Sequence, residues 1–198
     1  GAELLRKLQL MKPGARLAAA VTVLGEITAR HRPAALALAD WGKSSRFAGS
    51  GDRAAVGNLV YDVLRRRGSL AARMGAHTPR ALVLGAATRA LGLDAAQIAA
   101  AADGSKHALT PLTDAERAAL ENTQPLGEDE LLADLPAWTV PLLRPVFGDR
   151  LPDEAAALSE RAPVDIRVNT LKTTREKVLA ELAKLAPVTT DFSPLGIR

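Results

Sequence analysis

Apolar side chains recur at helical spacing through the first 160 residues, and this period most restricts the fold of the chain. A stripe that starts at Leu17 repeats at i, i+3, i+4 and i+7 and predicts an amphipathic helix over residues 15–30. Pro33 suits the first turn of a short helix that reaches Trp41, and residues 42–51 form a predicted polar loop. The pattern therefore predicts a mainly α fold, built as a bundle of helices.

The clearest helix is predicted over residues 52–67. Asp52 is a good N-cap, and the apolar stripe that begins at Val56 keeps the helical period. Three arginines, Arg65 to Arg67, place cations at the carboxyl end of this helix, and Gly68 provides a stop.

Shorter helices are predicted from residue 78 onward, where Gly and Pro interrupt the pattern more often. Each begins at a polar cap, an acidic first turn or a proline, which are the usual signals of a helix start. The predicted starts lie at Thr78, Asp94, Thr113, Glu128 and Pro152.

At Val164 the period changes from helical to alternating. Val164, Ile166 and Val168 alternate with polar residues, which predicts a half-buried strand. A helix capped by Thr173 and a second strand over residues 188–190 complete a β-α-β unit, and another strand begins near the carboxyl end. Two strands and one helix are too few for an independent sheet, so we expect the chain to be a piece of a longer protein.

Composition excludes several kinds of site. The sequence has no cysteine, and its three histidines are scattered, so a thiolate nucleophile or a cysteine-ligated metal is excluded and a histidine-built metal site is not expected. No phosphate-binding loop, nucleophile elbow or HExxH motif is present, so we expect no catalytic, cofactor-binding or metal site in these residues. No apolar run approaches the roughly 20 residues of a membrane span, and no secretory signal is visible. We expect a cytoplasmic protein with no membrane partner.

Charge is unevenly distributed behind a small net value of +4. Residues 1–80 carry 14 basic and 5 acidic groups, a net charge of +9, whereas residues 103–160 carry 4 basic and 12 acidic groups, a net charge of −8. This asymmetry favours contact between the amino-terminal part and a polyanion. An uneven surface with no partner is the alternative.

Arginine and lysine side chains of the amino-terminal part are the candidates for such a contact, because guanidinium groups bind phosphates in bidentate fashion and the attraction is salt-sensitive. Helix-end packing of Arg65, Arg66 and Arg67 is an alternative for those three, and a turn-capping role is an alternative for Asn169. We predict an RNA-binding face made of Arg16, Arg30, Arg32, Lys43, Arg46, Arg53, Arg65, Arg66 and Arg67, with Arg167, Asn169 and Lys172 as an RNA-facing or interdomain set near the predicted strand.

Aromatic residues are scarce, at 3% of the chain, and they are not interleaved with the basic residues. We therefore expect most of them to lie in the core. Any bound RNA is expected to be structured and held by phosphate and shape contacts rather than by base stacking.

Two stretches of the sequence resemble one protein family. RLAAAV at residues 16–21, followed by GDRAAVGNLVYDVLRRR at 51–67, resembles the NusB-like amino-terminal domain of RsmB-type (Sun/Fmu) ribosomal RNA cytosine-5 methyltransferases. APVDIRVNTLKTTR at residues 162–175 resembles the start of the small RNA-binding subdomain that precedes their catalytic domain. The two stretches occur in the family's order, and the resemblance spans residues 15–198.

The resemblance implies a domain order. Residues 1–14 are a leader or an expression remnant, 15–135 a NusB-like helical RNA-binding domain, 136–162 a helical connector, and 163–198 an incomplete α/β RNA-binding subdomain. A methyltransferase domain, which these residues do not contain, would follow.

The resemblance also implies a role. In such enzymes one cysteine attacks the target cytosine, a second assists release, and S-adenosylmethionine donates the methyl group. This chain has no cysteine and no cofactor loop, so we expect it to be inactive alone, to bind no cofactor and to dock structured small-subunit (16S) rRNA beside the methyltransferase domain. Two alternatives stay open: a standalone NusB-like antitermination module that recruits protein partners, and a helical interaction scaffold.

Overall fold

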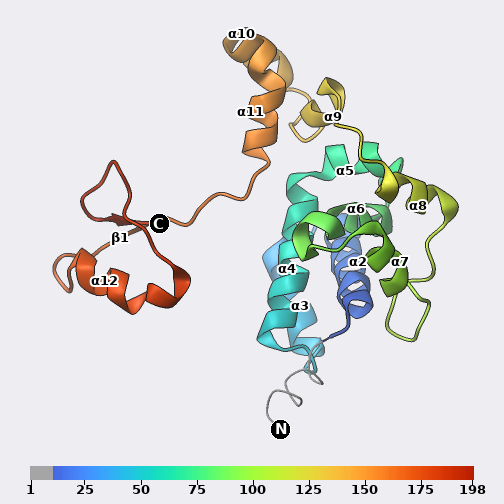
Figure 1. Ribbon diagram of the computed structural model, residues 1–198, viewed down its shortest axis with the longest axis horizontal. Helices are drawn as coiled ribbons and strands as arrows, with labels where there is room; N and C mark the ends of the chain where they lie inside the picture. Colours follow the sequence, from blue (N-terminus) through green and yellow to red (C-terminus); the bar gives the residue numbers. More distant parts are fainter. Residues whose placement is uncertain (1–10) are drawn as a thin grey trace. The chain divides into compact units, whose positions relative to one another are not determined.

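The computed structural model describes residues 11–198, which divide into two compact units between Glu160 and Arg161. The first unit is helical, and the predicted mainly α fold is confirmed. Its centre is formed by three helices that contact one another (Figure 1): α2 (Pro13–Arg30), α4 (Ser50–Arg65) and α6 (Pro79–Leu91). The other helices of this unit are α3 (Ala34–Ser44), α5 (Arg67–Met74), α7 (Ala95–Ala101), α8 (Asp114–Glu121), α9 (Glu128–Leu132), α10 (Val140–Phe147) and α11 (Leu151–Leu158), with a 3-10 turn at Gly148–Arg150.

The predicted apolar stripes form the main core. Leu17 and Leu24 of α2 are fully buried beside Leu59 and Val60 of α4 and Val83 of α6. Each such side chain contributes about 1.5–3 kcal/mol of transfer free energy when it leaves water, so this cluster holds the bundle together.

Three of the predicted helix starts are confirmed as side-chain caps. Thr78, Asp94 and Thr113 each accept a hydrogen bond from the backbone N–H three residues later. Gly92, at φ +66°, ends α6, because it adopts a left-handed conformation that glycine reaches without strain.

The predicted loop over residues 42–51 and the predicted N-cap at Asp52 are wrong. Helix α3 continues to Ser44 and α4 begins at Ser50, which leaves a shorter connection. Asp52 lies within the first turn of α4, where its carboxylate accepts a hydrogen bond from the Gly49 N–H at 3.2 Å. The backbone cap is therefore Gly49, and Asp52 satisfies it from inside the helix.

The single helix predicted over residues 52–67 is two helices. The backbone of Arg66 leaves helical geometry, at φ −125° and ψ 27°, so that α4 ends at Arg65 and α5 begins at Arg67. Gly68 is not a stop but a residue of the first turn of α5. A Cβ at Gly68 would lie 1.9 Å from the carbonyl oxygen of Ala133, so glycine is needed there for close packing against the segment that follows α9.

That same segment caps α5 from a distance. Asp134 accepts hydrogen bonds from the Ser69 N–H at 2.8 Å and the Ser69 hydroxyl at 2.6 Å. A second apolar cluster continues from here into α11, with Leu132, Leu151 and Ala155 buried and Phe147 packed against them.

The second unit, residues 161–198, holds a small sheet and one helix. Strand β1 (Ile166–Arg167) pairs antiparallel with β2 (Gly196–Ile197), and Thr189 forms an antiparallel bridge to Ile197 on the other side of β2. The outer segments at 166–167 and 189 therefore run parallel, and α12 (Arg175–Glu181) connects them. This is a split β-α-β arrangement with an antiparallel strand in the middle.

Two details of the second unit differ from prediction. Thr174, rather than Thr173, caps α12 through the Lys177 N–H. Of the alternating residues predicted to be half-buried, Val168 is buried, whereas Val164 and Ile166 are 72% and 41% exposed. Within the described residues, the sheet of three short segments and its one helix are too small to bury these two side chains.

Candidate nucleic-acid interface

The predicted basic residues of the helical unit lie toward both ends of α4 rather than in one patch. Arg53 lies in the first turn of α4 and Arg46 shortly before it, whereas Arg65 lies in the last turn. Sixteen residues at about 1.5 Å each separate the two ends by about 24 Å, so the structure does not bring these cations to one point.

Arg16 is held by a buried carboxylate. Its guanidinium donates to Asp52 Oδ1 at 2.8 Å through Nη2 and at 3.0 Å through Nε, and Asp52 is fully buried. Asp52 also accepts from the Met11 N–H at 3.1 Å. Because removal of either charge would leave the other uncompensated, Arg16 ties α2 to α4 and has little freedom to turn toward a phosphate.

Three more of the predicted cations have exposed acidic partners. Arg30 pairs with Glu26 at 3.1 Å, while Arg32 and Lys43 share Asp40 at 2.5 and 3.5 Å. The hydrogen bond from Arg32 is the main reason why the pKa of Asp40 is lowered. Such exposed pairs exchange readily, so an incoming phosphate can replace the carboxylate.

At the carboxyl end of α4, Arg65 and Arg66 belong to an ion-pair network. Asp62 accepts from Arg65 at 3.2 Å, and Glu160 accepts from Arg66 at 2.7 Å and also from Arg89. Burial works against ionisation of Glu160, but the two guanidinium groups lower its pKa overall. Arg89 is not among the cations predicted from the sequence, although its place in the last turn of α6 is a usual one for a cation.

Arg46 and Arg67 are the most available of the predicted cations. Both are exposed, and neither forms an ion pair within residues 11–198. Arg53 is exposed too, but its Nε donates to the Ala48 carbonyl at 3.1 Å and its chain packs over Gly42.

In the second unit, Arg167 and Lys172 are exposed, and Asn169 closes a turn. The Asn169 side-chain oxygen accepts from the Leu171 N–H at 3.1 Å, which is the turn role left open by the sequence. The RNA-binding role of all twelve residues stays a prediction.

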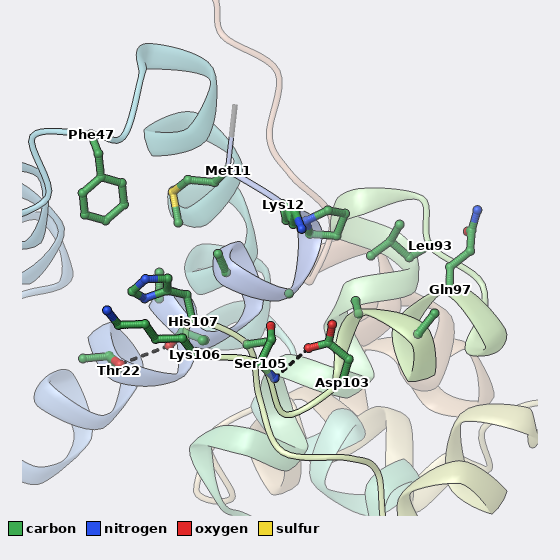
Figure 2. A pocket seen from close by; sticks show the side chains of 18 of the residues that line it. Met11, Lys12, Thr22, Phe47, Leu93, Gln97, Asp103, Ser105, Lys106 and His107 are labelled. Atoms are coloured by element: carbon green, nitrogen blue, oxygen red, sulfur yellow. Dashed lines mark hydrogen bonds between the residues drawn. The ribbon is translucent and has the colours of Figure 1, made fainter. Parts of the chain in front are cut away.

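A groove of about 1,080 Å³ lies beside the amino-terminal end of α2. Alanines of α2 and α7, with Trp41 of α3 and Leu93, provide its apolar lining. Figure 2 shows Phe47, Met11, His107 and Lys106 together at one end, with Leu93 and Gln97 at the other and Lys12 on the rim.

A short loop carries Lys106 and His107 to this groove. The loop is closed by hydrogen bonds from the Gly104 N–H to the Leu109 carbonyl and from the Ala108 N–H to the Ser105 carbonyl, both at 2.9 Å. Asp103 accepts from the Ser105 N–H, also at 2.9 Å, and this bond is the largest cause of a lowered pKa for Asp103 (Figure 2). These three hydrogen bonds fix the shape of the loop.

The expectation that most aromatic residues lie in the core is wrong. Phe47 and Trp138 are each 71% exposed, Tyr61 is 41% exposed, and the Phe192 side chain is open to solvent. One available signal in the sequence was the position of Phe47 among Gly, Ser and Arg residues, where an apolar stripe is lacking.

Comparison with known proteins identifies the carboxyl-terminal part. Residues 135–198 match the family model described as the ferredoxin-like domain of RsmF/B-like methyltransferases. This segment is similar to that domain. The resemblance found at residues 162–175 lies within the match, and so does the split β-α-β arrangement, which is the half-unit from which ferredoxin-like folds are built. No curated protein and no solved structure matches the chain significantly.

Two further features are absent from residues 11–198. No described helix has the length and apolarity that a bilayer crossing requires. No three acidic or histidine side chains converge there as a metal site would need.

Proposed function

We propose that this chain is the RNA-recognition portion of an S-adenosylmethionine-dependent 16S rRNA (cytosine-5)-methyltransferase of the cytoplasm. The observation that carries the proposal is the match of residues 135–198 to the RsmF/B-like ferredoxin-like domain. The likeness of residues 51–67 to the NusB-like domain of the same family extends the proposal to the helical unit.

RNA binding and methyl transfer are carried out by different parts of the proposed enzyme. Attack on the cytosine ring in this family requires a cysteine, and the 198 residues contain none. The chain therefore binds and orients the RNA, while S-adenosylmethionine and the cysteines act in the methyltransferase domain.

Exposed cations supply the affinity. Arg46 and Arg67 have exposed guanidinium groups, and the Arg32 and Lys43 pairs with Asp40 can open toward phosphate. Each phosphate that a cation neutralises releases counterions, so the binding constant must fall as salt rises.

The test is the salt dependence of binding to a structured 16S rRNA fragment, followed by fluorescence anisotropy. Replacing Arg46 and Arg67 together by Gln is expected to weaken binding and to flatten the slope of log K against log salt by up to about two units, about one for each lost contact. Arg65→Gln is expected to change the slope less, because Arg65 is already paired with Asp62.

Arg117→Gln is the matched control, because Arg117 is exposed on the acidic part of the chain, in α8. An equal slope for the wild type and the Arg46/Arg67 variant would show that these two arginines do not contact RNA phosphates. Failure of the wild type to bind the fragment at low salt would refute the proposed function.

A further inference from the structure

The groove beside α2 has an apolar floor and a predominantly basic rim. Of the charged side chains that line it, Lys12 and Lys106 are cationic, and Asp103 is the anionic one. The Asp103 carboxylate accepts from the Ser105 N–H and lies close enough to Lys12 to interact with its charge, which leaves the rim with one cation in excess. The rim therefore complements an anion, while the floor favours an apolar ring.

Phe47 stands at this rim with most of its surface in water. At 71% exposure its ring loses the transfer free energy that burial would give, and an exposed aromatic beside cations is a common feature of surfaces that stack nucleobases. Figure 2 places the His107 ring at the same end of the groove, with the Lys106 ammonium beside it.

The groove is built by tight backbone packing. A Cβ at Gly14 would lie 2.2 Å from the Ala101 carbonyl oxygen, so the first turn of α2 meets the end of α7 at a distance that only glycine permits. Ala15, Ala18 and Ala19 leave a shallow floor with no large side chains. The hydrogen bonds within residues 103–109 hold the opposite wall in place.

We propose that this groove receives one unpaired nucleotide of the RNA. The base lies on the alanine floor and stacks on Phe47, and the adjoining phosphate lies beside the Lys106 ammonium at the same end of the groove. A double-stranded segment cannot enter in this way, because its base faces are already stacked, whereas a bulged or loop nucleotide can. The volume of about 1,080 Å³ is ample for one nucleotide.

The inference rests on the proposed function for the identity of the RNA. It adds a site that binds an unpaired nucleotide. Phosphate contacts alone would bind a fully paired hairpin as well as a bulged one. The groove predicts a preference for the bulged hairpin.

The experiment compares two RNA hairpins that differ by one bulged nucleotide, with 2-aminopurine at the bulge as the probe, using the whole 198-residue chain. The wild type is expected to prefer the bulged hairpin and to quench the probe. Phe47→Ala is expected to lower affinity for the bulged hairpin by about 5- to 100-fold and to abolish quenching. Lys106→Gln is expected to reduce the salt slope by about one unit.

Trp138→Ala is the matched control, because Trp138 is equally exposed and does not line the groove. Phe47 is mostly in solvent, so its variant should keep the wild-type melting temperature, which is measured alongside. Equal loss in the Phe47 and Trp138 variants, or equal binding of both hairpins by the wild type, would overturn the groove site while leaving rRNA docking intact.

Two other outcomes separate the proposals. Quenching of the bulged probe with no binding to the 16S fragment would support the groove and refute the proposed function. A concentration-dependent dimer in sedimentation that Phe47→Ala abolishes, with RNA affinity unchanged, would show that a second copy occupies the groove and would overturn the inference.

Discussion

Asp52 shows how a residue's role depends on partners that are distant in sequence. Its position suggests an N-cap, yet its fully buried carboxylate accepts from the guanidinium of Arg16, the backbone of Met11 and the backbone of Gly49. These bonds join the start of α2 to the start of α4. They also keep Arg16 paired, unlike the exposed cations that we propose as RNA contacts.

Replacing Asp52 by Asn is expected to lower the free energy of unfolding by about 2–3 kcal/mol, because the neutral amide leaves the Arg16 cation without a counter-charge and its –NH2 group cannot accept the bond that Oδ2 takes from the Gly49 N–H. Urea unfolding followed by circular dichroism measures the change. Asp129→Asn is the control, an exposed acid in the first turn of α9, and should cost less than about 1 kcal/mol. Equal losses of unfolding free energy for the two substitutions would show that the buried Asp52–Arg16 pair contributes no more stability than an exposed carboxylate.

The first turn of α5, directly after the break from α4, is capped by a segment that comes 65 residues later. Asp134 caps α5 at Ser69, and the backbone of Ala133 packs against Gly68. Together they hold α9 against α5, and α9 in turn contacts α11. The acidic middle of the chain is therefore packed against the basic bundle and does not serve only as a solvated linker.

Replacing Gly68 by Ala is expected to destabilise the protein by about 1–3 kcal/mol, since the new methyl group forces the Ala133 backbone away. Hydrogen exchange should show the amides of α9 opening first. Gly57→Ala is the matched control: this glycine lies inside α4, where the nearest atom to a new Cβ is 4.0 Å away, so the change should stabilise by about 0.5–1 kcal/mol. Similar effects at both positions would contradict the packing argument.

At the scale of the whole molecule, acid should unfold the protein through its paired carboxylates. Within residues 11–198, every carboxyl group with a resolved shift has a lowered pKa, and hydrogen bonds and nearby cations are the causes that lower it. A carboxyl group whose pKa is lowered in the folded state stabilises the protein fully when the pH lies above the ordinary pKa of that group. That stability is lost as pH falls through the folded value.

The pair of Glu116 and Arg80, which joins α8 to α6, gives the sharpest test. The hydrogen bond from Arg80 is the largest cause of the lowered pKa of Glu116, whose ordinary value is 4.5, and both side chains are mostly buried. Glu116→Gln is expected to reduce the loss of unfolding free energy between pH 6 and pH 3 by about 1 kcal/mol. Glu121→Gln, at the exposed end of α8, should leave the pH profile unchanged. Identical profiles for the wild type and the Glu116 variant would refute the assignment.

The sequence by itself predicted the mainly α class, the apolar stripe from Leu17, and the caps at Thr78, Asp94 and Thr113. It also contained the resemblance at residues 162–175 that the family match includes. These features depend on residues within a few positions of one another, because helical periodicity and capping are set by contacts at i+3 and i+4.

Tertiary structure alone decided which of the described cations lack an ion-pair partner, where the helix predicted over residues 52–67 breaks, and which aromatic side chains are exposed. Arg16 meets Asp52 across 36 residues, Ser69 meets Asp134 across 65, and Arg66 meets Glu160 across 94. A local pattern carries no information on such pairs, since each forms only when packing brings the distant segments into contact. The free arginines and the groove at Phe47 are therefore properties of the folded chain.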